Sequence, residues 1–160
     1  MKNLCRKFKD QRGFNLIELM IVIAIIALLI GVGVPAWQSM VRSGNETTAI
    51  QSLTTIRTLQ SQYASKHQGK FAANFEELVK SVQLDGDKFK GESPVVNGYI
   101  YTMTVQESSG TTPAFYSIKA NPQVSEGIQA TGTRFFYFDS TLGTLKYSEE
   151  GEASQQSPSI

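Results

Sequence analysis

Residues 14–37 read FNLIELMIVIAIIALLIGVGVPAW and dominate this chain of 160 residues. From Leu19 to Trp37 no side chain is charged or strongly polar. A helix of this length would measure about 36 Å at roughly 1.5 Å per residue, whereas the apolar core of a bilayer is about 30 Å thick. The stretch therefore predicts a helix that spans a membrane.

A cluster of basic residues precedes this stretch. Within the first twelve positions one acid, Asp10, is outnumbered by five basic residues: Lys2, Arg6, Lys7, Lys9 and Arg12. Positive charges beside an apolar helix stay on the cytoplasmic side, so we expect the N-terminus in the cytoplasm and the chain after the helix on the opposite side of the membrane. Because the formal net charge is only +1, the remaining residues carry an excess of acids. No nucleic-acid partner is predicted, since such a partner requires a basic face.

The helix is predicted to continue beyond the membrane. Apolar residues recur at steps of one, three and four, which line one face of a helix: Ala49, Ile50, Leu53, Ile56, Leu59 and Tyr63. Lys66 and His67 suit the last turn, and Gly69 ends the pattern. We expect one helix of about 50 residues, whose N-terminal part is surrounded by lipid and whose C-terminal part packs on a domain.

The remainder predicts a small α+β head. Asn74 and Glu77 resemble a capping box that opens a short helix. Alternating apolar residues predict four strands, over 98–106, 114–120, 133–139 and 144–148. The expected fold is a long N-terminal helix, part transmembrane and part amphipathic, packed on a small four-stranded antiparallel sheet. Along the chain we expect a leader, the membrane helix, the head and a frayed polar tail: residues 1–13, 14–37, 38–148 and 149–160.

Glu18 does not fit a plain anchor or an ordinary signal peptide. An acid inside an apolar segment costs on the order of a few kcal/mol, so it needs a partner. Cleavage between Gly13 and Phe14 would create a free amine about one helical turn from Glu18. The acid therefore points to processing of the chain at this position.

Residues 12–22, RGFNLIELMIV, resemble the class III signal of type IV prepilins and type II secretion pseudopilins. The resemblance lies in the basic leader, the glycine, the aromatic residue, the spacing to Glu18 and the apolar run. It implies that a prepilin peptidase cuts after Gly13 and that the amine of Phe14 is methylated. Glu18 would then pair with the Phe14 amine of a neighbouring subunit.

The same resemblance implies a homo-oligomeric helical filament and no enzymatic activity. Mature subunits would wait in the lipid of the inner membrane until a platform protein and a cytoplasmic ATPase extrude them as an extracellular filament. Gly31, Gly33 and Pro35 would weaken the helix so that it can unwind locally inside the filament. Small residues and proline are also simply tolerated in membrane helices, so both explanations stay open here.

No cofactor or metal is predicted. Asp85 and Asp87 flank a glycine and read as a turn, and His67, the single histidine, has no cluster of metal ligands around it. No set of residues for nucleophilic catalysis can be assembled. The alternatives to a pilin are a major pseudopilin, a membrane-anchored envelope binding module, and a secreted protein cut after Ala36. The absence of cysteine after Cys5 slightly favours a pseudopilin, whereas the lack of a convincing calcium loop disfavours it.

Overall fold

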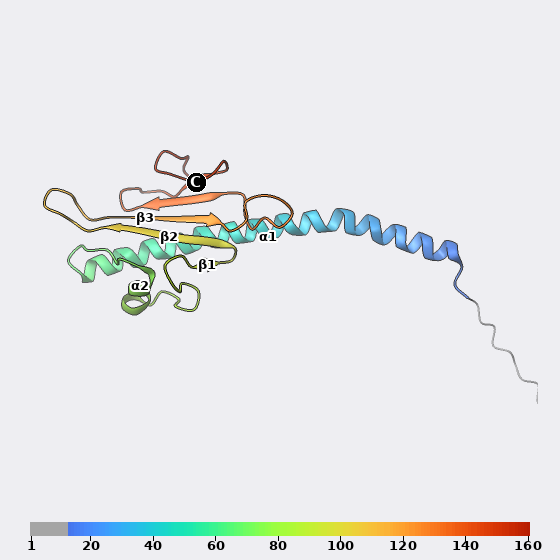
Figure 1. Cartoon of the computed structure of the whole chain (residues 1–160), viewed down its shortest axis with the longest axis horizontal. Coiled ribbons are helices and arrows are strands. Elements are labelled where there is room, and N and C mark those ends of the chain that lie inside the picture. The colour runs from blue at the N-terminus through green and yellow to red at the C-terminus, as the bar shows by residue number, and fades with distance from the viewer. Residues whose placement is uncertain (1–12) are drawn as a thin grey trace, which may run out of the picture. The chain divides into compact units, whose positions relative to one another are not determined.

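A computed structural model describes residues 13–160. The predicted leader lies outside the described residues except for Gly13, as does Cys5. The chain divides into two compact units, the first ending at Ala36 and the second running from Trp37 to Ile160. The long helix α1 (Leu16–Lys66), drawn from blue to green in Figure 1, contributes residues to both units.

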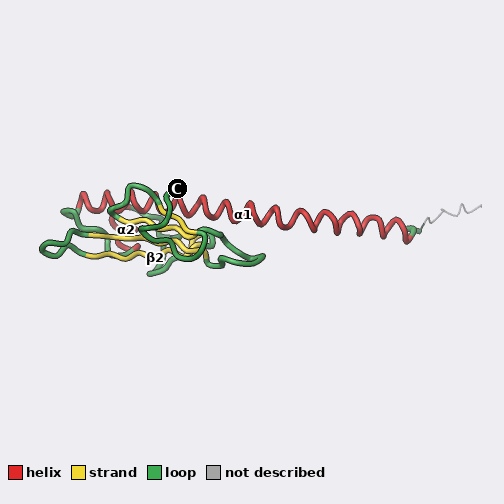
Figure 2. Tube along the Cα trace, turned by 90° about the horizontal axis from the view of Figure 1, so that it is seen from above, coloured by secondary structure: helices red, strands yellow, loops and turns green. Residues whose placement is uncertain are grey.

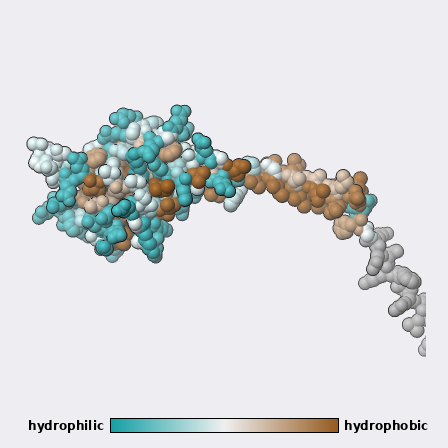
Figure 3. All heavy atoms as spheres, in the orientation of Figure 1, coloured by the Kyte–Doolittle hydropathy of each residue, from teal (hydrophilic) through white to brown (hydrophobic). Residues whose placement is uncertain are grey.

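The first unit consists mainly of the apolar part of α1. Every described side chain from Gly13 to Trp37 is exposed, including that of Phe14, which is 86% exposed. This stretch forms the predominantly brown, hydrophobic shaft in Figure 3. Within residues 13–160, α1 is the one helix that is long and apolar enough to cross a membrane. The predicted long helix is thus confirmed, and its 51 residues match the expected length.

The second part of α1 is amphipathic in the predicted manner. Its buried residues follow one another at steps of three and four: Glu46, Ala49, Leu53, Ile56 and Gln60. The opposite face is rich in Ser and Thr. Their hydroxyls donate to carbonyls one turn back, as Thr54 does to Ile50 at 2.9 Å and Thr58 to Thr54 at 3.0 Å. These local bonds satisfy polar groups on the exposed face without using charges.

A short helix, α2 (Phe75–Val82), follows the loop after α1. The Asn74 side chain accepts a hydrogen bond from the Glu77 N–H at 2.9 Å, so the predicted N-terminal cap is confirmed. The buried face of α2 comprises Phe75, Leu78 and Val82. This face joins the same core as α1, and Figure 2 shows α2 along the part of α1 where the strands lie.

The sheet is an antiparallel meander of five strands rather than four, in the order β1-β2-β3-β4-β5. Its strands are β1 (Val95–Val96), β2 (Tyr99–Gln106), β3 (Phe115–Pro122), β4 (Phe135–Asp139) and β5 (Lys146–Ser148). The four predicted strands correspond to β2–β5. Strand β1 was missed because two residues show no alternation. Asn97 and Gly98 between β1 and β2 both have positive φ, as a tight Asn-Gly hairpin requires.

One face of the sheet covers the buried stripe of α1. Tyr101, Ala120 and Phe136 stand opposite one another across β2, β3 and β4, and all three are fully buried. Gln60 is the polar member of the stripe. Its amide donates to the carbonyl of Ala72 at 3.1 Å and accepts from the Ala72 N–H at 2.9 Å. A buried amide paired on both sides costs little and ties α1 to the loop before α2.

The C-terminal segment differs from the expected frayed tail. The N–H of Ile160 donates to the carbonyl of Leu145 at 3.0 Å, and the N–H of Tyr147 donates to that of Pro158 at 2.9 Å. Ala153 is 2% exposed. The composition of residues 149–160 is polar, but β5 is an edge strand whose free N–H and C=O groups pair with this segment. Composition alone could not reveal that edge.

The packing of α1 on the sheet gives a first prediction. Residues 38–160 should fold without the anchor, and Leu53→Asp should reduce their free energy of unfolding by about 3–5 kcal/mol, because Leu53 is 1% exposed and the new charge would lack a partner. Urea unfolding of this fragment checks the value. The matched control is Gln51→Asp, the same new charge at an exposed position of the same helix. Equal unfolding midpoints for the two variants would contradict the packing described here.

Candidate functional site

The first turn of α1 contains a reciprocal cap. Asn15 stands just before the helix, and its side-chain oxygen accepts a hydrogen bond from the Ile17 N–H at 3.3 Å. The Glu18 carboxylate in turn accepts from the Asn15 N–H at 3.2 Å through Oε2. This arrangement is a capping box, in which two backbone N–H groups at the helix start are satisfied by side chains.

Sequence analysis missed this cap. The pattern Asn-x-x-Glu at residues 15–18 is the same as the pattern at 74–77, which was recognised. At residues 15–18 the acid lies in an apolar segment, which points to a charged partner, whereas the bond found is to a backbone N–H. The cap occupies Oε2 of Glu18 without neutralising its charge, and no ion pair to Glu18 is found among residues 13–160. The carboxylate therefore has a structural role, and its charge has no cationic partner within the described part of the chain.

Gly13 and Phe14 lie in the exposed segment before the helix. Neither residue belongs to a helix or strand, and a Cβ placed at Gly13 would meet no atom of the described residues within 4 Å. A peptide bond in such a segment can enter the extended cleft of a peptidase without unfolding of α1. The geometry is compatible with the predicted cleavage between these residues.

Gly31, Gly33 and Pro35 all lie inside α1. A Cβ at either glycine would meet no atom within 4 Å, so packing within this chain does not require glycine there. Pro35 has no N–H to donate to the carbonyl one turn back, which belongs to Gly31. Glycine costs about 1 kcal/mol and proline about 3 kcal/mol in a helix interior. These residues reduce the stability of one helical segment, and their role in unwinding stays a prediction.

Comparison with known proteins adds a match at the N-terminus. The family described as "Prokaryotic N-terminal methylation motif" matches residues 8–34. Among similar proteins, the prepilin peptidase-dependent protein D of Escherichia coli (strain K12) is 36% identical over 95 residues, 59% of this chain and 58% of its own length. The type IV major pilin protein PilE of Neisseria gonorrhoeae is 33% identical over 99 residues, 62% of this chain and 59% of its own length.

A further relative extends the similarity into the head. The type IV major alpha-pilin of Moraxella bovis is 30% identical over 135 residues, 84% of this chain. The chain belongs to the type IV pilin and pseudopilin family. The aligned part covers 66% of the Moraxella protein and 58% of the Escherichia protein, less than two thirds of each relative's own length.

Other candidate residues of this pilin-family chain have local structural partners. Asp85 pairs with Lys88 at 2.9 Å and Asp87 with Lys90 at 3.2 Å. The ring of His67 stacks on that of Tyr63, with centroids 4.0 Å apart. In residues 13–160, no group of three or more His, Cys, Asp or Glu side chains is placed to hold a metal ion.

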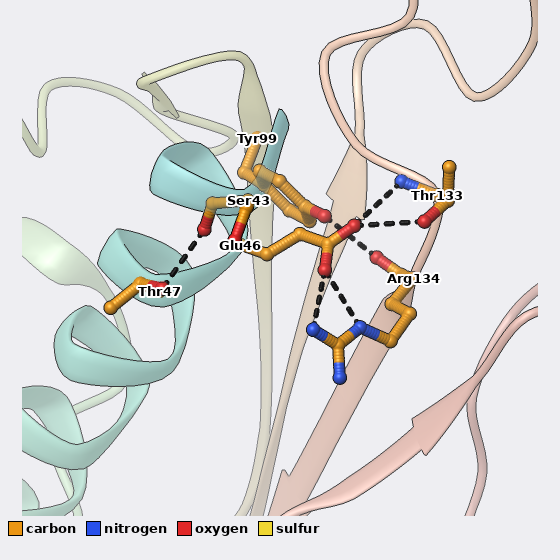
Figure 4. Close-up of polar contacts among 6 residues, drawn as sticks. All are labelled: Ser43, Glu46, Thr47, Tyr99, Thr133 and Arg134. Carbon is orange, nitrogen blue, oxygen red and sulfur yellow. Dashed lines mark hydrogen bonds and ion pairs between the residues drawn. The ribbon is translucent and has the colours of Figure 1, made fainter. Parts of the chain in front are cut away.

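The pilin head also contains a buried acid that sequence analysis did not single out. Glu46, on the buried face of α1, accepts hydrogen bonds from the N–H and hydroxyl of Thr133, both at 2.9 Å (Figure 4). Its other oxygen accepts from Nε of Arg134 at 2.7 Å. Glu46 continues the spacing of Ala49 and Leu53 by one step toward the membrane segment. That spacing could have predicted that Glu46 is buried.

The Glu46 cluster ties the segment before β4 to α1. The hydroxyl of Tyr99 donates to the carbonyl of Arg134 at 2.8 Å, so β2 contributes to the cluster as well. Burial alone would raise the pKa of the Glu46 carboxyl. The hydrogen bonds from Thr133 and Arg134 outweigh burial and hold this pKa below its ordinary value of 4.5. The ionised form of Glu46 is therefore favoured in the folded head.

The lowered pKa predicts a loss of stability in acid. A carboxyl whose pKa is lower when folded stabilises the fold above the unfolded value and loses that contribution as the pH falls below about 4.5. Glu46→Gln should reduce the free energy of unfolding at neutral pH by about 1.5–3 kcal/mol and by less in acid. Urea unfolding of the head at pH values from neutral to below about 4.5 measures both effects.

The matched control is Glu76→Gln, which removes an exposed carboxylate of α2. It should leave both the stability and its pH profile close to those of the parent. A constant difference between Glu46→Gln and the parent at every pH would contradict the assigned ionisation.

Proposed function

We propose that this chain is a structural subunit of a type IV pilus-like filament and has no enzymatic activity. The observation that carries the proposal is the exposed apolar part of α1, with Glu18 as its one acid at the first turn. The head, by contrast, buries its own core. A helix whose whole circumference is apolar is unstable in water, so it requires lipid before assembly and other apolar helices afterwards.

Processing and location follow from the N-terminal motif. A prepilin peptidase would cut after Gly13, and a methyltransferase would modify the amine of Phe14. The mature subunit would remain in the inner membrane through residues 14–37, with its N-terminus cytoplasmic and its head outside. A platform protein and a cytoplasmic ATPase would then add it to a surface filament. The name of the Escherichia relative supports the peptidase step, the matched motif supports the methylation, and the names of the other two relatives support assembly into a pilus.

A pseudopilin of a type II secretion system is the second candidate. Residues 13–160 contain no cysteine, so the head is closed without the disulfide found in many pilins. The segment after β5 is held by hydrogen bonds to β5 and to the residue preceding it. Electron microscopy of purified surface filaments, with mass spectrometry of their subunits, separates a pilus from a periplasmic pseudopilus.

The first prediction here concerns the mature N-terminus. Protein purified from a host with prepilin peptidase should begin at Phe14 and carry one added methyl group, which intact mass and N-terminal sequencing determine. Gly13→Glu should block cleavage, because the new charged side chain would occupy the place of the smallest residue. A chain that starts at Met1 would indicate a plain anchor, and one that starts at Trp37 an ordinary secreted protein.

The second prediction separates the two roles of Glu18. A capping box accepts Glu or Gln, so Glu18→Gln should keep the cap while removing the charge, and Glu18→Ala should lose both. If the charge pairs with the Phe14 amine of a neighbouring subunit, both variants should be cleaved and retained in the membrane but form few or no filaments. Filament yield from each variant, expressed as the sole copy, provides the measurement.

The capping function has its own control. Asn15→Ala removes the Oδ1 that caps the Ile17 N–H but leaves Glu18 in place. It should assemble filaments at near-parental yield, because it costs only about 1 kcal/mol at one helix end. Normal assembly of Glu18→Gln together with failure of Asn15→Ala would reverse the assignment, leaving Glu18 as a cap and not as a charge partner.

A further inference from the structure

The exposed apolar side chains of the second unit are concentrated at one place. Seven large hydrophobic residues are exposed between Trp37 and Ile160, and five of them lie in the first turns of this unit or in the loop between β3 and β4, residues 123–134. These five are Trp37, Met40, Val41, Val124 and Ile128. The other two, Val95 and Ile160, lie in β1 and at the C-terminus.

Three of these side chains share one groove. Trp37, Val41 and Ile128 line a hollow of about 230 Å³ between α1 and the β3–β4 loop. We call these three residues the junction patch. Trp37 is 66% exposed and Ile128 74% exposed. In Figure 1 the loop is the orange segment beside the cyan part of α1.

Hydrogen bonds hold the loop in this position. The guanidinium of Arg42 donates to the carbonyl of Gly127 at 2.7 Å, and the amide of Asn45 donates to the carbonyl of Thr131 at 2.9 Å. The hydroxyl of Thr131 donates to the carbonyl of Gly98 at 2.7 Å. Ile128 is therefore presented by a fixed turn next to Trp37, and its exposure does not result from an unattached loop.

Position along the chain identifies what faces the patch. Trp37 is the last residue of the apolar segment 14–37 and the first residue of the second unit, so in a subunit stored in the membrane the patch would lie at the membrane surface. Tryptophan favours this zone because its ring is apolar and its N–H is polar. Ile128 is flanked in sequence by exposed Gly127 and Gln129, an apolar tip in a polar turn. The hollow has eight lining residues, whereas a stable contact between proteins takes about 20–30 residues a side.

We propose that the junction patch inserts into the interfacial region of the bilayer and docks the stored subunit's head on the membrane. The occupant is the boundary between headgroups and acyl chains, into which an apolar surface sinks by about 5–10 Å. Trp37 lies in the interfacial region and so sets how deep α1 lies in the bilayer. Ile128 is the second inserted side chain, and Arg42 holds the loop that contains it. Two points of attachment restrict how the head can tilt on the membrane surface. This inference rests on the proposed membrane storage of the subunit.

Tryptophan fluorescence in lipid nanodiscs tests the docking with the full chain. The sequence contains one tryptophan, so Trp37→Phe provides a silent background. In that background Ile128→Trp reports on the patch. Ser109→Trp is the matched control, at an exposed position in the β2–β3 turn. Gly98, which bonds to the β3–β4 loop, precedes β2, whereas Ser109 follows it. The eight residues of β2 span about 26 Å at roughly 3.3 Å per residue.

Docking predicts that a lipid with a nitroxide near its headgroup quenches the emission of the Ile128→Trp chain and leaves that of the Ser109→Trp chain unchanged. The Ile128→Trp emission should also shift to the blue on reconstitution, and iodide should quench it less than the control. Because the insertion is apolar, raising the salt concentration should not reverse it. Equal behaviour of the two variants would overturn the proposal.

The parent chain separates failure of docking from failure of the anchor. Quenching of native Trp37 by the nitroxide lipid, without quenching in the Ile128→Trp chain, overturns docking and leaves the membrane anchor intact. No quenching of Trp37 overturns both. In a third outcome, neither the nitroxide lipid nor iodide quenches the Ile128→Trp emission, and the emission depends on the number of chains per disc. This outcome would assign the patch to a second copy of the chain and overturn the lipid contact.

Discussion

The packing of one face of α1 on the sheet is the contact on which the head depends. Leu53 and Ile56 enter a core built by alternate residues of β2, β3 and β4, and removal of that helical face would expose the inner side of the whole sheet. Two polar residues border this apolar contact. Gln60 ties α1 to the loop before α2, and Glu46 ties it to the segment before β4. Burial provides the stabilisation, and the two polar ties fix where along α1 the sheet lies.

The two parts of α1 require different surroundings. From Leu19 to Trp37 its side chains are exposed and apolar on all sides, which only lipid or other apolar helices can accommodate. From Glu46 onward one face is buried and the other carries hydroxyls bonded back to the helix. Membrane storage and polymerisation, as proposed, would use the first part, while the second keeps the head folded in either state. The junction patch lies where the apolar part of α1 meets the part that packs on the sheet.

The sequence predicted most of this fold because its strongest patterns are local. The apolar run, the stripe containing Leu53 and Ile56, the cap at Asn74 and four strands are each readable within a few consecutive turns or strands. What it did not predict depends on pairing between distant segments: the ion pair of Glu46 with Arg134, and the attachment of Ile160 beside Leu145. Strand β1 was missed for a different reason. Its Asn-Gly turn was visible, but a strand of two residues carries no period.

At the candidate site, the sequence identified the unusual residue but not its bond. The cost of an acid in an apolar segment singled out Glu18, but that cost predicts only a charged partner. The structure adds a partner that needs no charge, the Asn15 N–H, bound through Oε2. A carboxylate can accept several hydrogen bonds, so this cap leaves capacity for a cation. A neighbouring amine could then bind a Glu18 already oriented by its own helix, and assembly would not have to order that side chain first.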